Sequence, residues 1–297
     1  MIQDIAPYKL NNSFYPERTI RPEDNVIVYK DRQILVRVDK EDDTFDFPKL
    51  SDICKETKCV KLSECFEDGE FEHDQFIYLF SIDEKYYFLY NSNDIDNIKI
   101  DDSFEYKLVR SLTKHPQKPQ INAFAAFTAM HLAEWYGRQK FCSRCGHPLV
   151  HSENERAMKC EECGYIIYPR LNPAVIVGVR NGDSLLLTKY RQGYGYNALV
   201  AGFVEIGETL EECVAREVME ETGLSVKNIT YYKSQPWGIA GDILVGFYCD
   251  VDGDDTIHMD DNELKYAEWV RREDIELQPA NYSLTNEMMR MFKNGNY

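Results

Sequence analysis

Residues 202–224 read GFVEIGETLEECVAREVMEETGL, and this stretch decides how the C-terminal part of the chain folds. Thr209 followed by Glu212 forms a capping box, so the sequence predicts a helix that starts at Thr209. Gly223 is suited to end that helix after about three and a half turns. Apolar residues recur at i+4 spacing and predict a buried stripe: Leu210, Val214 and Val218.

Glutamates gather beside this stripe on one face of the predicted helix. Glu217 and Glu221 are four residues apart, and Glu220 lies one turn from Glu217, so the three carboxylates are neighbours. Crowded carboxylates repel one another unless a cation neutralises them, and their oxygens suit Mg²⁺ or Mn²⁺. Arg216 can pair with Glu212 or Glu220 and hold the cluster in shape.

A solvated acidic helix face is the alternative interpretation, and the preceding loop argues against it. Gly202 and Gly207 allow a tight turn that returns Glu208 and backbone groups over the helix N-terminus. Phosphate is favoured at that position. The stretch therefore predicts a divalent-cation site for phosphate chemistry.

The same stretch resembles the Nudix box, G-x5-E-x7-R-E-U-x-E-E-x-G-U with U apolar, and every defined position from Gly202 to Leu224 matches. The resemblance implies an α/β/α sandwich around a mixed sheet. It also implies an enzyme that hydrolyses a diphosphate linked to another group. A bound Mg²⁺ would neutralise and orient the diphosphate and activate water.

A second metal site is predicted by paired cysteines, Cys142-x2-Cys145 and, after fourteen residues, Cys160-x2-Cys163. Four thiolates leave no open coordination position, so one structural Zn²⁺ per chain is expected. Disulfides or unrelated buried cysteines are the alternatives. The remaining cysteines show no such pairing and are interpreted as ordinary side chains: Cys54, Cys59, Cys65, Cys213 and Cys249.

Composition limits the partners of the chain. Its 297 residues carry a formal net charge of −17, which argues against general binding to nucleic-acid backbones or anionic membranes. The sequence has no apolar run of transmembrane length, and its N-terminus lacks a signal-peptide core. We therefore expect a cytoplasmic protein without membrane contact or extended nucleic-acid contacts.

Three domains are expected: residues 1–137, a zinc ribbon at 138–170, and a Nudix domain at 171–297. The first is expected to be rich in strands, with hairpins Asn25–Lys30/Ile34–Val38 and Phe76–Ile82/Tyr86–Tyr90, acidic loops Glu41–Asp46 and Asn91–Asp102, and a helix Asn122–Tyr136 closed by Gly137. On that helix His131 and Trp135 are expected to pack.

The third domain is expected to form a mixed sheet between helices. Its predicted elements are a hairpin Ala174–Arg180/Ser184–Lys189, strands Thr230–Ser234, Asp242–Val251 and Ala267–Val270, and a final helix Ser283–Phe292.

Ser234-Gln235-Pro236-Trp237, together with the four-cysteine segment, resembles the NADH pyrophosphatase family of Nudix hydrolases. The similarity runs from about Ala133 to the C-terminus and is loose before it. The resemblance implies cleavage of NAD(H) to nicotinamide mononucleotide and AMP, a homodimer, and Mg²⁺ or Mn²⁺. Some members remove NAD caps, so the 5′ end of NAD-capped RNA is a further expected partner.

The resemblance also implies residue roles. The metal ligands would be the Ala201 carbonyl, Glu217, Glu220, Glu221 and Glu263, and the catalytic residues Arg216, Glu217, Glu220 and Glu221. The substrate contacts would be Glu155, Tyr168, Phe203, Gln235, Pro236 and Trp237. Among these, Phe203 and Trp237 would sandwich the nicotinamide ring, and Glu155 and Tyr168 would lie near the adenosine half. Taken alone, Trp237 would be read as a core aromatic.

One segment departs from the family pattern. The family continues QPW with P-F-P-x-S, whereas this chain has residues 238–242 as GIAGD. A carboxylate at Asp242 near a diphosphate should weaken binding, which puts the NADH preference in doubt more than the hydrolysis. The alternatives are hydrolysis of ADP-ribose, a dinucleoside polyphosphate or FAD, or a non-catalytic nucleotide-sensing module. The intact glutamates argue against the sensor.

Overall fold

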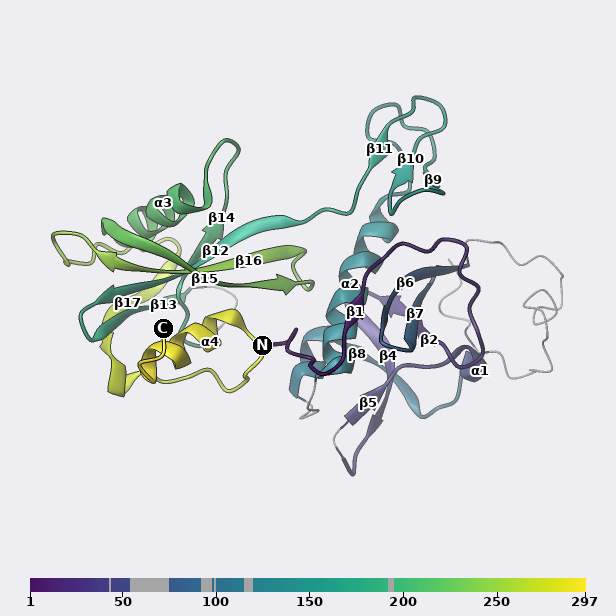
Figure 1. Cartoon of the computed structure of the whole chain (residues 1–297), viewed down its shortest axis with the longest axis horizontal. Helices are drawn as coiled ribbons and strands as arrows, with labels where there is room; N and C mark the ends of the chain where they lie inside the picture. The colour runs from purple at the N-terminus through teal and green to yellow at the C-terminus, as the bar shows by residue number, and fades with distance from the viewer. Residues whose placement is uncertain (43, 54–74, 92–97, 99, 115–119, 192–194) are drawn as a thin grey trace. The chain divides into compact units, whose positions relative to one another are not determined.

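The structure, a computed structural model, describes residues 1–42, 44–53, 75–91, 98, 100–114, 120–191 and 195–297. It divides into two compact units, which Figure 1 shows. The C-terminal unit consists of residues 1–3, 171–237 and 241–297, and the N-terminal unit of residues 4–170 and 238–240.

The C-terminal unit is built on a six-stranded mixed sheet. Its strands are β12 (Asn172–Asn181), β13 (Ser184–Tyr190), β14 (Val200–Phe203), β15 (Val226–Trp237), β16 (Asp242–Val251) and β17 (Leu264–Arg271). Their order is β15-β16-β12-β13-β17, with β14 paired to β12. Only the β12–β16 pair is parallel, and the other pairs are antiparallel.

Helix α3 (Leu210–Thr222) and helix α4 (Leu284–Lys293) cover opposite faces of this sheet (Figure 1). Side chains alternate between the faces of a strand, and β12 follows this rule. Val175 and Val177 pack with Val214 of α3, whereas Ile176 packs with Met288 of α4. The predicted α/β/α sandwich around a mixed sheet is therefore confirmed.

The predicted limits of α3 are also confirmed. The Thr209 hydroxyl accepts a hydrogen bond from the Glu212 backbone N–H at 3.2 Å, and the Glu212 carboxylate accepts one from the Thr209 N–H at 2.8 Å. Gly223 ends the helix in the left-handed region, with φ of 69°, and its N–H donates to the Met219 carbonyl. Both ends of the helix are thus fixed by local contacts.

Three further predictions in this unit are confirmed in kind. The β12–β13 hairpin turns at residues 181–183, β16 has the predicted bounds, and α4 begins after Ser283, whose hydroxyl caps it. Strands β15 and β17 are longer than the predicted Thr230–Ser234 and Ala267–Val270. They extend because backbone pairing with β16 and β13 continues beyond the apolar residues.

Before the cysteine segment, the described residues of the N-terminal unit form two four-stranded sheets. One has the order β1-β6-β7-β2, from strands β1 (Leu10–Asn11), β2 (Asn25–Ile27), β6 (Phe76–Ile82) and β7 (Lys85–Tyr90). The other has the order β3-β4-β5 with β8 beside β4, from strands β3 (Tyr29–Lys30), β4 (Gln33–Asp39), β5 (Thr44–Asp46) and β8 (Phe104–Leu108). The helical elements are α1 (Leu50–Ile53), η3 (Val109–Lys114) and α2 (Ile121–Arg138).

The β6–β7 hairpin is confirmed, but two predictions for the strands and loops of this unit are wrong in part. Tyr29–Lys30 pairs with β4 as expected, whereas Asn25–Ile27 runs parallel to β7 in the other sheet. The stretch Glu41–Asp46 is not wholly a loop, because Thr44–Asp46 forms β5 and buries Phe45. Cys54, Cys59 and Cys65, and residues 92–97 and 99 of the second acidic stretch, lie outside the described residues.

Helix α2 runs one residue beyond Gly137, which was predicted to close it, and ends when the Gln139 N–H donates to the Trp135 carbonyl. Trp135 is buried, as expected of a packing residue, and the His131 ring nitrogen Nε2 lies 2.8 Å from the Arg170 carbonyl. After α2 comes a three-stranded antiparallel ribbon, β9 (Val150–His151), β10 (Met158–Lys159) and β11 (Ile166–Ile167).

Candidate functional site

Arg216 is the centre of the acidic cluster in the C-terminal unit. Its Nε donates to Glu208 at 2.8 Å, and its Nη1 donates to Glu217 at 2.8 Å and to Glu220 at 3.0 Å. The hydrogen bond from Arg216 lowers the pKa of Glu208 to about 2. Of the two partners predicted for Arg216, Glu220 is correct and Glu212 is not, because the Glu212 carboxylate is used in the capping box.

Gly202 is required by the position of Glu217. A Cβ atom at residue 202 would lie 1.9 Å from the Cδ atom of Glu217, so any side chain there would displace the carboxylate. Strand β14 therefore approaches α3 closely enough to enclose Glu217. Desolvation by burial raises the pKa of this carboxyl group, and Arg216 opposes the shift.

Glu221 is the most buried carboxylate of the cluster, with 3% of its surface exposed. The Tyr190 hydroxyl lies 3.2 Å from its Oε1 and 3.4 Å from its Oε2. Burial, together with the charges of Glu217 and Glu263, raises the pKa of Glu221 to about 8, although the hydrogen bond from Tyr190 opposes the shift. A buried acid beside two others is the arrangement that a bound cation relieves.

Residues 258–263 bring Glu263 to this cluster. The His258 N–H donates to the Thr222 carbonyl at 2.8 Å, and the Asp260 N–H donates to the Glu221 carbonyl at 2.9 Å. These bonds use carbonyl groups at the end of α3 that have no partner within the helix. The predicted ligands Glu217, Glu221 and Glu263 therefore lie near one another.

The donor set fits a hard divalent cation that also binds substrate. The cluster offers carboxylate oxygens and, at the adjacent strand β14, the Ala201 carbonyl, which lies 3.5 Å from the Tyr190 hydroxyl. Among the described residues, only the four cysteines form a ligand group whose atoms all lie within 4.8 Å of one another. The carboxylates do not form such a closed cage. Mg²⁺ is usually bound in this way, by one or two carboxylates plus waters and phosphates.

The two aromatic residues predicted to bind the nicotinamide ring, Phe203 and Trp237, differ in their surroundings. Phe203 is exposed over 54% of its surface, directly after the β14 residues that adjoin Glu217. The Trp237 ring stacks on Tyr282, with centroids 5.9 Å apart and planes 10° apart. Trp237 is thus partly used in packing, but it is half-buried and does not belong to the core, and Pro236 is exposed.

Gln235 has a structural role in this conformation. Its side chain is fully buried, its Nε2 donates to Gln3 and to the Tyr282 carbonyl, and its oxygen accepts from the Leu284 N–H. It therefore helps to satisfy the first turn of α4. These contacts favour packing over the substrate contact predicted for Gln235.

The predicted adenosine contacts belong to the other unit. The Tyr168 hydroxyl donates to Glu155 at 3.0 Å, and Tyr168 is exposed over 55% of its surface. Glu155 and Tyr168 thus contact each other within the zinc ribbon of the N-terminal unit. The residues predicted to bind the nicotinamide ring, Phe203 and Trp237, belong to the C-terminal unit.

The unusual segment 238–242 is used in packing. A Cβ atom at Gly238 would lie 2.1 Å from the Phe127 carbonyl oxygen, and Arg32 donates to the Ile239 carbonyl at 2.7 Å. Asp242 is 5% exposed, and its carboxylate accepts a hydrogen bond from Asn172 at 3.2 Å. The expectation that Asp242 adds an open negative charge to the substrate site is therefore corrected, because this carboxylate is buried within the sheet.

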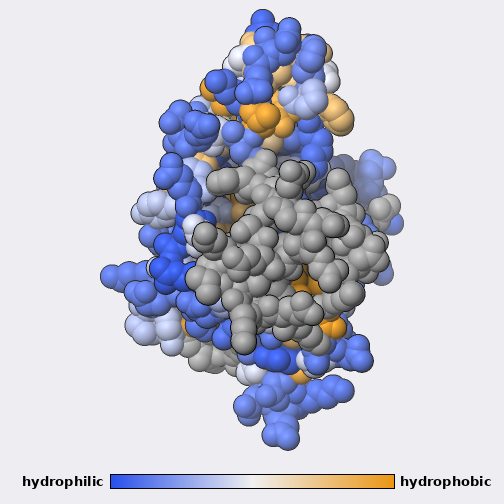
Figure 2. Space-filling model, turned by 90° about the vertical axis from the view of Figure 1, so that its right-hand side faces the viewer, coloured by the Kyte–Doolittle hydropathy of each residue, from blue (hydrophilic) through white to orange (hydrophobic). Residues whose placement is uncertain are grey.

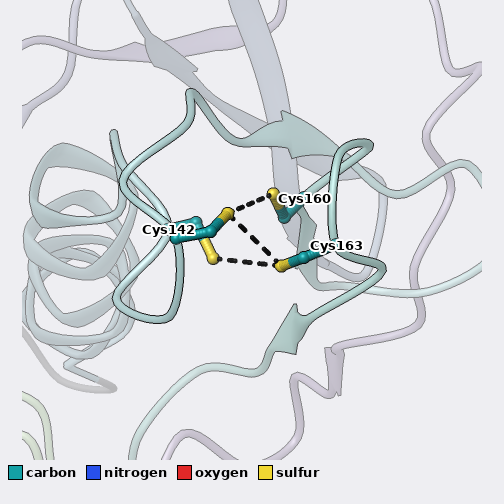
Figure 3. A group of neighbouring side chains, drawn as sticks. Cys142, Cys160 and Cys163 are labelled. Atoms are coloured by element: carbon teal, nitrogen blue, oxygen red, sulfur yellow. Dashed lines mark hydrogen bonds between the residues drawn. The ribbon is translucent and has the colours of Figure 1, made fainter.

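The four ribbon cysteines converge as predicted. The Sγ atoms of Cys142 and Cys163 are 3.6 Å apart, and that of Cys145 is 3.4 Å from those of Cys160 and Cys163 (Figure 3). Tetrahedral Zn–S bonds of about 2.3 Å place sulfurs about 3.8 Å apart, close to this spacing. All four are free thiols, which rules out disulfides among them. Cys213 and Cys249 are buried free thiols outside this group.

The described surface is mostly hydrophilic in the view of Figure 2, with small hydrophobic groups. None of the described helices has the length and apolar character needed to cross a membrane.

Comparison with known proteins agrees with this fold. Residues 170–292 match the NUDIX domain, and residues 138–168 match the NADH pyrophosphatase zinc ribbon domain. Residues 138–292 therefore contain a zinc ribbon domain of the NADH pyrophosphatase type followed by a NUDIX domain.

Its curated relatives include bacterial proteins named NAD-capped RNA hydrolase NudC. The protein of Salmonella schwarzengrund is 45% identical over 151 residues, and that of Klebsiella pneumoniae strain 342 is 46% identical over 152 residues. In both cases the matched region covers 50% of this chain and 58% of the relative. The chain thus spans a little over half the length of these relatives.

Solved structures of Nudix hydrolases are also similar. One from Nitrosomonas europaea is 22% identical, with a TM-score of 0.45. The matched region covers 52% of this chain and 91% of the chain in that structure. Another, titled an ADP-ribose pyrophosphatase from Streptococcus suis, is 16% identical, with a TM-score of 0.33. The matched region covers 42% of this chain and 92% of the chain in that structure.

Proposed function

We propose that this protein is a Mg²⁺- or Mn²⁺-dependent hydrolase that cleaves the diphosphate of NAD(H) to nicotinamide mononucleotide and AMP, and that the NAD cap of RNA is a further substrate. The observation that carries the proposal is the acidic cluster, in which Arg216 bonds Glu217 and Glu220 and the buried Glu221 lies near Glu217. The zinc ribbon and the relatives named NAD-capped RNA hydrolase support the choice of substrate.

The residues of the chain have separate tasks in this proposal. Glu217, Glu221, Glu263 and the Ala201 carbonyl would hold the cation, which supplies charge neutralisation and an activated water when bound. Arg216 keeps Glu208, Glu217 and Glu220 in fixed positions, so that little reorganisation is needed when substrate arrives. Phe203 offers an exposed flat ring to a base. Glu220, exposed and near the cluster, acts as ligand or base.

Burial of Asp242 supports a dinucleotide substrate. An open carboxylate would repel a diphosphate, but this one is held by Asn172 inside the sheet. The hydrogen bond from Asn172 fixes the Asp242 carboxylate within the sheet, so this side chain is not free to extend toward a bound diphosphate. The proposal further includes a homodimer in the cytoplasm, which rests on the family resemblance and is tested by light scattering of the purified protein.

The test is a substrate panel. Purified protein with Mg²⁺ is incubated with NADH, NAD⁺, NAD-capped RNA, ADP-ribose, Ap4A and FAD, and the products are separated by chromatography. We expect nicotinamide mononucleotide and AMP, with the highest kcat/KM for an NAD species. A higher kcat/KM for ADP-ribose contradicts the substrate assignment, and tight binding without turnover favours the nucleotide-sensing alternative.

Matched glutamine variants test the site itself. Glu217→Gln should lower kcat/KM by at least about a hundredfold, because a cation ligand supplies several kcal/mol of transition-state stabilisation. Glu211→Gln makes the same change at an exposed position of the same helix and should keep normal activity. Equal activity of the two variants contradicts the assignment of the metal site.

A further inference from the structure

Tyr190 lies outside the Nudix box, at the end of β13, yet it contacts two of the groups assigned to the cation. Its hydroxyl is 3.2 Å from Glu221 Oε1 and 3.5 Å from the Ala201 carbonyl oxygen. We propose that Tyr190 is a positioning residue that sets the affinity of the site for its divalent cation by fixing the Glu221 carboxylate. This inference rests on the proposed function for the identity of the cation site.

The position of Tyr190 follows from the alternation of β13. Leu185 and Leu187 face α4, whereas Leu186 packs in the cluster that contains α3. Side chains at every second residue share a face, so Tyr190 points to the α3 face, where Glu221 lies. Its place beside the acidic cluster is therefore built into the strand.

A β-bulge at this point brings the neighbouring loop into reach. Lys189 pairs with Tyr266, and Tyr190 then pairs with Leu264, so Lys265 is an extra residue on β17. Bulges bend a strand and redirect side chains, and they often occur beside active sites. Here the bulge lets the N–H of Arg191 donate to the Glu263 carbonyl at 3.0 Å.

Tyr190 and Arg191 together connect both sides of the acidic cluster. Tyr190 holds Glu221 on α3, and Arg191 holds the Glu263 backbone, with Nη2 3.9 Å from the Asp261 carboxylate and Nε bonded to the Asp261 carbonyl. Tyr190, the last residue of β13, thus fixes the Glu221 carboxylate, and Arg191, the next residue, fixes the backbone that carries Glu263.

The chemistry of a phenol suits this task. Arg216 already supplies a positive charge to Glu208, Glu217 and Glu220, and a second cationic donor at Glu221 would repel the metal. Tyr190 is a neutral donor, because a phenol with an ordinary pKa of about 10 keeps its proton at neutral pH. An ionised carboxylate has about four acceptor positions, so Glu221 can accept from Tyr190 and still bind a cation.

The experiment measures Mn²⁺ binding to the full chain without nucleotide, by calorimetry or by the spin-resonance signal of free Mn²⁺. Tyr190→Phe should raise the Kd by about 10- to 100-fold, the usual effect of removing a partner of a metal ligand. Its matched control is Tyr248→Phe. The Tyr248 hydroxyl donates to the Met288 carbonyl at 2.6 Å on the α4 face of the same sheet, so this variant should lose stability and keep the wild-type Kd.

Activity gives a second readout. In Tyr190→Phe the Mg²⁺ concentration for half-maximal rate should rise, and the rate at saturating Mg²⁺ should approach that of the wild type. An unchanged Mn²⁺ Kd in Tyr190→Phe overturns the inference, as does an equal rise in both variants. A wild-type protein that binds Mn²⁺ but hydrolyses none of the panel contradicts the proposed function and leaves the Mn²⁺ comparison decisive for Tyr190.

Discussion

The zinc ribbon and the Nudix acidic cluster both collect negatively charged ligands, and they hold them in opposite ways. In the ribbon, cysteine sulfurs lie 3.4–3.6 Å from one another and converge on one point. In the acidic cluster, Arg216 and Tyr190 hold individual carboxylates, which do not form a closed cage. A closed ligand set suits a permanent ion, whereas separately held ligands leave room for phosphate oxygens.

The largest expected effect comes from breaking the closed set. Cys160→Ser should abolish zinc binding and unfold the ribbon, because structural zinc contributes about 10 kcal/mol or more to the folding of such small sites. Metal analysis of the purified protein should show less than one zinc per chain. Cys249→Ala, which also removes a buried thiol, should keep one zinc; loss of zinc in both variants would contradict the assignment of the ligands.

In the acidic cluster a large effect should also come from a residue without a side chain. Gly202→Ala places a methyl group 1.9 Å from the Glu217 Cδ atom, so the carboxylate must move. Displacement of about 1 Å at a reacting centre costs about a hundredfold in rate, and kcat/KM should fall by that order. Gly195→Ala is the control, because a Cβ atom there meets no atom within 4 Å. Similar kinetics for the two variants would show that Glu217 is not held as described.

Arg216→Lys should have a smaller effect. A lysine keeps the positive charge but cannot hold several carboxylates at once, as the planar guanidinium does. We expect a decrease of about tenfold in kcat/KM, with a larger part in kcat than in KM, which corresponds to about 1.4 kcal/mol of lost transition-state stabilisation. Steady-state kinetics at saturating Mg²⁺ test this. Wild-type kinetics in the lysine variant would show that only the positive charge of Arg216 matters, and would contradict a positioning role for its guanidinium group.

The smallest effect concerns the pH dependence of stability. Arg216 lowers the pKa of Glu208 from 4.5 to about 2 in the folded protein. A lowered folded-state pKa gives a stabilisation that is complete above the unfolded value and is lost as pH falls from about 4.5 to about 2. Urea unfolding of wild type and Glu208→Gln should therefore diverge above pH 4.5 and converge towards pH 2. A constant difference across this window would contradict the pairing; zinc loss affects both proteins alike.

Local signals in the sequence were sufficient for much of the fold. The capping box at Thr209 and the glycine at 223 predicted both ends of α3, because each end is fixed by contacts within a few residues. The cysteine spacing predicted the ribbon for the same reason. Gly137 misled the prediction for α2, since a single glycine inside a packed helix costs only about 1 kcal/mol, which burial of residues such as Trp135 exceeds.

The errors arose where pairing is non-local. Asn25–Ile27 reads as one arm of a hairpin, but its partner β7 comes much later in the chain. Likewise, nothing in the sequence around Tyr190 indicates a bulge, because the extra residue lies on the partner strand β17. Asp242 is buried and bonded to Asn172, and the sequence alone does not show whether a carboxylate is buried or exposed.

The backbone bonds from His258 and Asp260 to the last turn of α3 have one more consequence. Segments joined in this way open and close as one cooperative unit, and their amides then exchange with solvent deuterium at related rates. The N–H groups of residues 258 and 260 should therefore exchange together with those at the end of α3. A cation bound at Glu221 would then also slow deuterium uptake at residues 258–260, which are far from Glu221 in the sequence. Deuterium exchange would therefore report cation binding without any substrate.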